Sequence, residues 1–158
     1  MKIILAGDSA GYHMKNELAA HISNMGHEVT DIGTHSEESV HYPIFGRLAA
    51  EKVATGEADR AILVCGTGVG MSLAANSVAG VRCANCPEPY TARLSRQHND
   101  ANVLALGARV IGMELAKMIV DTWLNADFEG GRHATRVDML TAMSNKPAPG
   151  AYIAPDMS

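Results

Sequence analysis

The stretch "AILVCGTGVGMS", residues 61–72, decides how this chain folds. It opens with four apolar residues in a row, which is typical of a strand covered on both faces in a parallel sheet. Cys65 ends that run, and three glycines (Gly66, Gly68 and Gly70) follow it within five residues. A helical pattern then begins. The stretch therefore predicts a strand that turns sharply into a helix, with a thiol placed at the turn.

The same alternation of short apolar runs and amphipathic stretches continues along the whole chain. It predicts a doubly wound parallel sheet of the α/β class. The order of strands is expected to be flavodoxin-like, with the first and third strands flanking the switch in strand order. One apolar set at helical spacing is expected to be core: Leu115, Met118, Ile119 and Trp123. Strands are expected near 2–7, 28–32, 60–65, 81–86 and 102–107, and helices near 12–25, 43–56, 70–78, 88–97, 112–125 and 133–144.

The chain length of 158 residues predicts one domain, which we place at residues 1–145. The remaining segment, 146–158, contains Pro147, Pro149 and Pro155 and is expected to leave the globule. Two interpretations of this tail remain open. It is either a free terminus or an arm that grips a partner subunit.

Composition and charge exclude several classes of function. A net charge of −4 gives no electrostatic support for nucleic-acid binding. No apolar run approaches the roughly 20 residues that span a bilayer, so no membrane partner is expected. The seven histidines lack the compact spacing of a metal site. Three cysteines, an odd number, argue against a disulfide framework and favour a reducing, cytoplasmic setting. Cys83 and Cys86, three apart on a strand, would point to opposite faces, which disfavours a metal or redox role.

Ligands in open α/β sheets bind at the carboxyl ends of the strands. Asp8 follows the first strand and Cys65 ends the third, so both are expected to face one crevice. Backbone N–H groups from Gly66 to Gly70 would form a nest that holds an anion and favours the thiolate. The alternative is a buried core cysteine at a tight turn. A thiol phosphatase is excluded because Met71 stands where its arginine is needed, and no Gly-Lys-Ser/Thr closes a P-loop.

Two polar segments carry further candidates. "SRQHNDAN", residues 95–102, contains His98, whose side chain titrates near neutrality and suits proton transfer. "EGGRHATR", residues 129–136, places Arg132 and Arg136 one helical turn apart, as a phosphate or carboxylate site requires. In both segments the alternative is a solvated surface group.

Taken together, "CGTGVGMSLAAN", "SRQHNDANVLALGARVIG" and "FEGGRHATRV" resemble the family of sugar-phosphate isomerases that includes type B ribose-5-phosphate isomerase and the galactose-6-phosphate isomerase subunits. The resemblance extends to about residue 145. It implies a Rossmann-like fold, aldose–ketose isomerisation through an enediolate, no metal and no cofactor. It also implies a homodimer or homotetramer whose site forms between subunits, with Cys65 and His98 possible from different chains. The default substrate pair, ribose 5-phosphate and ribulose 5-phosphate, would place the chain in the pentose phosphate pathway.

The resemblance also implies a role for each matching residue. Cys65 would be the base that moves a proton between C1 and C2, and His98 would open the sugar ring. Thr67 and the loop N–H groups would hold the enediolate oxygen. Arg132 and Arg136 would clamp the phosphate. The remaining substrate contacts would come from Asp8, Ser9, Gly66, Gly68, Val69, Gly70, Asn99 and Arg109.

One departure from the family pattern concerns the substrate. Ser9 stands where the family usually has histidine. His41, expected in the loop after the second strand, either reaches into the crevice as a partial substitute or is a solvated loop residue. Alternative substrates are therefore a tetrose (erythrose or erythrulose 4-phosphate) or a hexose (allose or galactose 6-phosphate). A non-catalytic sugar-phosphate-binding subunit is the alternative from another class of function.

Overall fold

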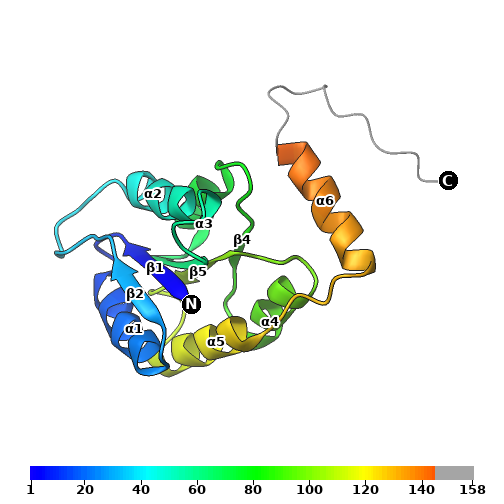
Figure 1. Ribbon diagram of the computed structural model, residues 1–158. Helices are drawn as coiled ribbons and strands as arrows, with labels where there is room; N and C mark the ends of the chain where they lie inside the picture. The colour runs from blue at the N-terminus through cyan, green and yellow to red at the C-terminus, as the bar shows by residue number, and fades with distance from the viewer. Residues whose placement is uncertain (145–158) are drawn as a thin grey trace.

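The computed structural model describes residues 1–144, which form one α/β unit (Figure 1). The expected tail at 146–158 lies outside the described residues. The strands are β1 (Lys2–Gly7), β2 (Glu28–Asp31), β3 (Arg60–Cys65), β4 (Cys83–Asn85) and β5 (Val103–Gly107). The helices are α1 (Tyr12–Asn24), α2 (Tyr42–Ala54), α3 (Val69–Asn76), α4 (Pro89–Gln97), α5 (Met113–Asn125) and α6 (Arg132–Ser144). The expected order of elements is confirmed, and β4 is shorter than expected.

All five strands are parallel, in the order β2-β1-β3-β5-β4. The first three positions match the flavodoxin-like expectation, so β1 and β3 do flank the switch in strand order. The last two positions are exchanged. All residues of β5 are buried, whereas Cys83, Ala84 and Asn85 of β4 are only half-buried. The more apolar strand therefore takes the interior position, and the short polar one becomes an edge.

Alternate residues of each central strand enter two separate cores, because successive side chains of a strand point to opposite faces. Ile62 and Val64 pack against α1, α4 and α5, while Leu63 and Cys65 pack against α2 and α3. Figure 1 shows the same two layers, with α2 and α3 on one side of the sheet and α1, α4 and α5 on the other. The catalytic candidate Cys65 is therefore on the α2/α3 side.

Helix α5 follows its predicted pattern with one exception. Ile119 and Trp123 are fully buried, and Leu115 packs at the edge of the core. Met118 is 57% exposed, so its assignment to the core was wrong. Its position one residue before Ile119 turns it about 100° around the helix, which is enough to leave the buried stripe.

Helix α6 stands apart from both helical layers in Figure 1. Only His133 and Val137 of this helix are buried. Within residues 1–144, none of the helices combines the length and the apolar character needed to cross a bilayer.

Candidate active site

The turn after β3 holds the Cys65 thiol against a backbone donor. The N–H of Gly68 donates a hydrogen bond to Sγ of Cys65, with 3.2 Å between the two atoms. Helix α3 begins at the next residue, and its first N–H, that of Val69, faces Oγ1 of Thr67 at 3.3 Å. A donated N–H stabilises a thiolate more than a thiol. The predicted combination of thiol, glycine turn and helix start is thus present in the fold.

The turn closes this tightly only because Gly68 lacks a side chain. Its φ is +81°, in the left-handed region that favours glycine. A Cβ there would lie 2.4 Å from Oδ1 of Asn85. Asn85 is held in this place by donating from Nδ2 to the carbonyl of Thr67 at 3.2 Å. Strand β4 therefore supports the turn from behind.

The loop after β1 packs directly onto the same strand end. The N–H of Asp8 donates to the carbonyl of Val64 at 3.2 Å, and Oδ1 of Asp8 accepts from the N–H of Gly11 at 3.0 Å. A Cβ on Gly11 would lie 2.2 Å from the carbonyl oxygen of Val64. Glycine at this position lets the first loop reach β3, and that contact brings Asp8 beside Cys65.

The end of β5 and the segment after it form the third side of the site around Cys65. Cys65 pairs with Gly107 in the sheet register, and the N–H of Arg109 donates to the carbonyl of Gly66 at 3.0 Å. Nη1 of Arg109 lies 3.5 Å from the position that a Cβ on Gly66 would occupy. A guanidinium is therefore held at the mouth of the glycine turn, where an anionic oxygen would be favoured.

These three loops enclose a cleft of about 410 Å³ at the carboxyl ends of β1, β3 and β5. Seven predicted site residues line it together with Tyr42 and Leu73, which the sequence did not indicate. The Tyr42 ring lies so close to Gly70 that a Cβ on the glycine would be 2.6 Å from it. An aromatic residue at the start of a helix has no sequence pattern that would have predicted its contact with Gly70. The seven are Asp8, Cys65, Gly66, Thr67, Val69, Gly70 and Arg109.

Three nearby residues do not line the cleft in the described part of the chain. Gly68 is buried beneath it, and Ser9 is half-buried next to Asp8. His41 is exposed and precedes α2, while its neighbour Tyr42 is the residue that turns into the cleft. The direct reach of His41 into the crevice is therefore absent from this arrangement.

The remaining candidates gather elsewhere. His98 caps the carboxyl end of α4, and its ring stacks on that of His133 with centroids 4.2 Å apart. Oε2 of Glu129 lies 3.8 Å from Nε2 of His98. Arg132 and Arg136 are both exposed, on the first turns of α6.

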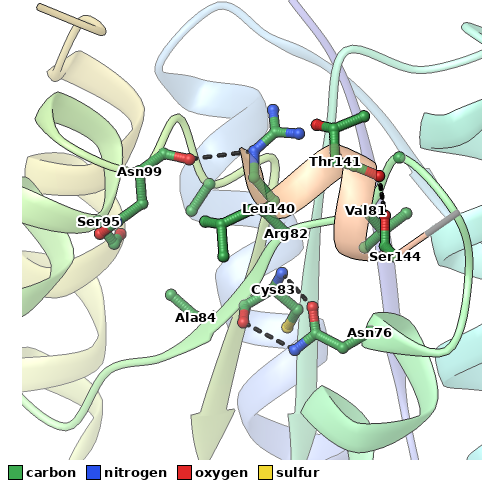
Figure 2. Close-up of a pocket in the computed structure, with 12 residues that line it drawn as sticks. Asn76, Val81, Arg82, Cys83, Ala84, Ser95, Asn99, Leu140, Thr141 and Ser144 are labelled. Carbon is green, nitrogen blue, oxygen red and sulfur yellow. Dashed lines mark hydrogen bonds between the residues drawn. The ribbon is translucent and has the colours of Figure 1, made fainter. Parts of the chain in front are cut away.

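Asn99 lines a second pocket of about 350 Å³ between β4, α4 and α6. Figure 2 shows this pocket, with Ser95 and Asn99 on one side and Asn76 and Ser144 on the other. The carbonyl of Asn99 accepts from Nε of Arg82 at 3.0 Å. Asn99 is therefore separated from the Cys65 cleft within one chain.

The separation follows from the topology. Helices that connect parallel strands run antiparallel to them, so the carboxyl end of α4 lies at the amino edge of the sheet. The loop from His98 enters β5 there, since the N–H of Ala61 at the start of β3 donates to the carbonyl of Asn102 at 3.2 Å. Cys65 lies at the carboxyl edge. One chain brings Cys65, the glycine turn, Asp8 and Arg109 together, but it does not bring His98, Asn99, Arg132 or Arg136 to them.

The other two cysteines have different surroundings. Burial raises the pKa of Cys86 to about 11, and burial also raises the pKa of Cys83. Cys86 packs with the α1/α4/α5 core and Cys83 with the α2/α3 core, so they do point to opposite faces. Both therefore remain thiols at neutral pH.

One group in residues 1–144 has metal-ligating side chains close together: His98, Glu129 and His133, with ligand atoms within 4.8 Å of one another. The two imidazole planes are nearly parallel, at 6°. In-plane lone pairs of parallel stacked rings do not converge on one ion as a tetrahedral site requires. This arrangement is poorly suited to a metal.

Comparison with known proteins identifies the relatives of this arrangement. A family model described as "Ribose/Galactose Isomerase" matches residues 3–140. The chain is 54% identical over 145 residues to ribose-5-phosphate isomerase B of Escherichia coli, covering 92% of this chain and 97% of that protein. It is 42% identical over 141 residues to the D-erythrulose-4-phosphate isomerase of Pectobacterium atrosepticum, covering 89% and 93%. The solved structure of ribose-5-phosphate isomerase B from Clostridium thermocellum superposes with a TM-score of 0.90 at 56% identity, covering 90% and 97%.

Proposed function

Because the chain belongs to the ribose/galactose isomerase family, it is an aldose–ketose isomerase of sugar phosphates, and we propose that it interconverts ribose 5-phosphate and ribulose 5-phosphate. The observation that carries the residue assignment is the Cys65 thiol, which accepts an N–H from Gly68 in the same cleft as Asp8 and Arg109. A binding module has no need of a nucleophilic sulfur beside an anion cradle.

In this mechanism the Cys65 thiolate takes the proton from C2 of the open-chain aldose. The electron pair moves through C1 to the carbonyl oxygen, which becomes the enediolate oxygen. The loop N–H groups and the Thr67 hydroxyl stabilise that charge, because they are fixed in place before it develops. Cys65 then returns the proton to C1, while the proton of the O2 hydroxyl passes to O1, so that C2 becomes the carbonyl and the ketose is formed. No co-reactant is needed, since the substrate is both oxidised and reduced.

The substrate enters largely as a closed ring, so it must open first, and we assign this step to His98. Since His98 lies at the other edge of the sheet, it would act in the cleft of a second copy of the chain. Arg132 and Arg136 of that second copy would bind the phosphate of the same substrate. This arrangement makes a homodimer the smallest active unit, and a homotetramer would be a pair of such dimers.

Exposed apolar side chains beside the cleft support this dimer. Val69 and Leu73 of α3 are exposed, Leu73 by 67%, and so are Ile44 and Leu48 of α2, the helix that packs against α3. Large exposed apolar residues next to a functional cleft are typical of a subunit interface. We propose that the second copy covers this surface and places its His98 above Cys65.

The proposed activity would place the protein in the cytoplasm, in the pentose phosphate pathway. Its three cysteines are free thiols in the structure, as expected in a reducing compartment.

The second candidate function is isomerisation of a sugar phosphate with a different number of carbons. The presence of Ser9 is the observation that favours it. Serine is smaller than the histidine that the family pattern predicts there, and it stands beside Asp8 at the end of β1. A four-carbon or six-carbon sugar phosphate would then fit differently. The resemblance to a D-erythrulose-4-phosphate isomerase makes the four-carbon option specific.

The deciding experiment is a panel of aldose phosphates with four, five and six carbons, offered to the purified chain while ketose formation is followed. We expect the highest kcat/KM for ribose 5-phosphate, and a Cys65→Ala preparation serves as the blank. A higher kcat/KM for erythrose 4-phosphate or for allose 6-phosphate would replace the five-carbon assignment. Tight binding of all three without ketose formation would show a non-catalytic subunit.

A further inference from the structure

The cluster around His98 contains two groups that the mechanism above does not use. Oε2 of Glu129 lies 3.6 Å from Nε2 of His133 and 3.8 Å from Nε2 of His98, so one carboxylate faces both imidazoles. The N–H of Glu129 donates to the carbonyl of Gln97 at 3.0 Å. The backbone thus holds the carboxylate next to the end of α4.

His133 is a poor choice for packing alone. Its side chain is 7% exposed, and its Nε2 has no hydrogen-bond partner within residues 1–144. A buried polar atom without a partner lowers the free energy of unfolding, whereas an apolar ring of similar size would fill the same space at no such cost. The nitrogen of His133 therefore calls for a role beyond packing.

The electrostatic surroundings keep His133 neutral. Burial lowers its pKa, and the positive charges of a protonated His98, of Arg132 and of Arg136 lower it further, against the opposing effect of Glu129. A neutral imidazole carries one N–H. With that proton on Nε2, His133 points a donor at the Glu129 carboxylate. Catalytic hydrogen bonds are often long before substrate binds, so a spacing of 3.6 Å fits this contact.

We propose that His133 and Glu129 are positioning residues for His98: the N–H of His133 holds the Glu129 carboxylate beside His98, and this carboxylate stabilises the imidazolium that His98 becomes during ring opening. The inference rests on the proposed role of His98. His98 takes the proton of the C1 hydroxyl, the bond between C1 and the ring oxygen breaks, and the ring oxygen takes the proton from His98. His98 is positive only between the two transfers, and a fixed anion lowers the energy of that state.

The test compares His133→Phe, Glu129→Gln and the double variant in the purified full chain. We expect each single variant to lower kcat for ribose 5-phosphate by roughly 10- to 100-fold, the scale for misplacing a reacting group. If His133 acts through Glu129, the double variant loses no more than the larger single loss. The melting temperature of His133→Phe should be equal to or above that of the parent, because a phenyl ring fills the same buried space and leaves no buried nitrogen whose acceptor lies as far away as 3.6 Å.

A second measurement separates ring opening from phosphate binding. Ribitol 5-phosphate is an open-chain analogue with the same phosphate, so its calorimetric Kd should be unchanged in both single variants. His27→Phe is the control, since burial also lowers the pKa of His27 but it lies beside β2, at the opposite side of the sheet from β4. It should retain the parental kcat.

Three results would overturn the proposal: parental kcat in His133→Phe, additive losses in the double variant, or equal weakening of ribitol 5-phosphate binding. Parental kcat in His98→Ala would instead reject the proposed role of His98 itself. The two failures are therefore distinguishable.

Discussion

Cys65 and His98 lie at opposite ends of the strands in the same five-stranded sheet. Cys65 ends β3 at the carboxyl edge, while His98 caps α4, which runs back to the amino edge. The two side chains cannot be brought together by rotating either of them, because the length of a strand separates them. If both act on one sugar, they act from two different chains.

This relationship predicts complementation between inactive variants. Cys65→Ala and His98→Ala should each lose most activity alone. Mixed and allowed to exchange subunits, they should recover about a quarter of the parental activity, because half of the dimers are mixed and one of the two sites in each mixed dimer is intact. The measurement is the isomerase rate before and after mixing. No recovery, despite exchange shown by mass spectrometry, would place both residues in one chain's site.

Cys65→Ala should lower kcat by roughly 10²- to 10⁴-fold, the range for losing a general base. Binding of a phosphorylated open-chain analogue, measured by calorimetry, should change little because the loop N–H groups remain. Cys86→Ala is the matched control: burial raises the pKa of that thiol to about 11, so it takes no part in proton transfer at neutral pH. Near-parental kcat in Cys65→Ala would reject the assignment.

Gly68→Ala should damage activity and stability together. Its φ of +81° is strained for alanine, and the new Cβ would meet Oδ1 of Asn85 at 2.4 Å. We expect kcat to fall roughly 100-fold, the scale for misplacing a reacting group, because the displaced turn would no longer hold the Gly68 N–H against Sγ of Cys65. Gly56→Ala is the control, since Gly56 has a φ of +79° but no atom within 4 Å of its Cβ position. It should cost roughly 1 to 2 kcal/mol of stability and leave kcat intact. Equal effects of the two variants on kcat would contradict a role for the Gly68 turn.

Replacing Arg132 or Arg136 with alanine should weaken substrate binding through the phosphate. We expect a loss of roughly 1.5 to 3 kcal/mol for each, the scale of a hydrogen bond to a charged group. The loss should shrink for the same sugar without phosphate. Arg93→Ala serves as the control, because Arg93 is an exposed arginine that lies over the Tyr90 ring of its own helix. Equal losses for phosphorylated and free sugar would point to a structural role for the arginines.

Ser9→His should narrow the choice of sugar. The larger side chain fills space beside Asp8 and adds a donor, so we expect kcat/KM for a six-carbon phosphate to fall relative to ribose 5-phosphate, by roughly tenfold or more. His41→Ala tests the alternative that His41 compensates for the serine. Since Tyr42 rather than His41 lines the cleft, the ratios across the panel should stay unchanged in that variant. A fixed preference in Ser9→His would show that this position does not select the substrate.

The sequence alone predicted the order of the elements and most of the residues that line the Cys65 cleft. Apolar runs such as residues 61–64 identify buried strands, and glycines directly after a strand identify a turn that approaches a ligand. These signals are local, because periodicity and glycine placement act within a few residues. That is why Asp8, Cys65 and Arg109, each placed at or just after the end of a strand, could be expected to meet in one cleft, and they do.

The tertiary structure decided what depends on contacts between distant segments. The exchange of β4 and β5 follows from which strand buries more apolar surface, and no single segment reveals that comparison. The contact of Tyr42 with Gly70 and the stacking of His133 on His98 join residues 28 and 35 positions apart. The separation of the predicted site residues between the two ends of the strands has the same origin: each motif specifies its own turn, but the direction of the connecting helices sets the end of the sheet at which that turn emerges.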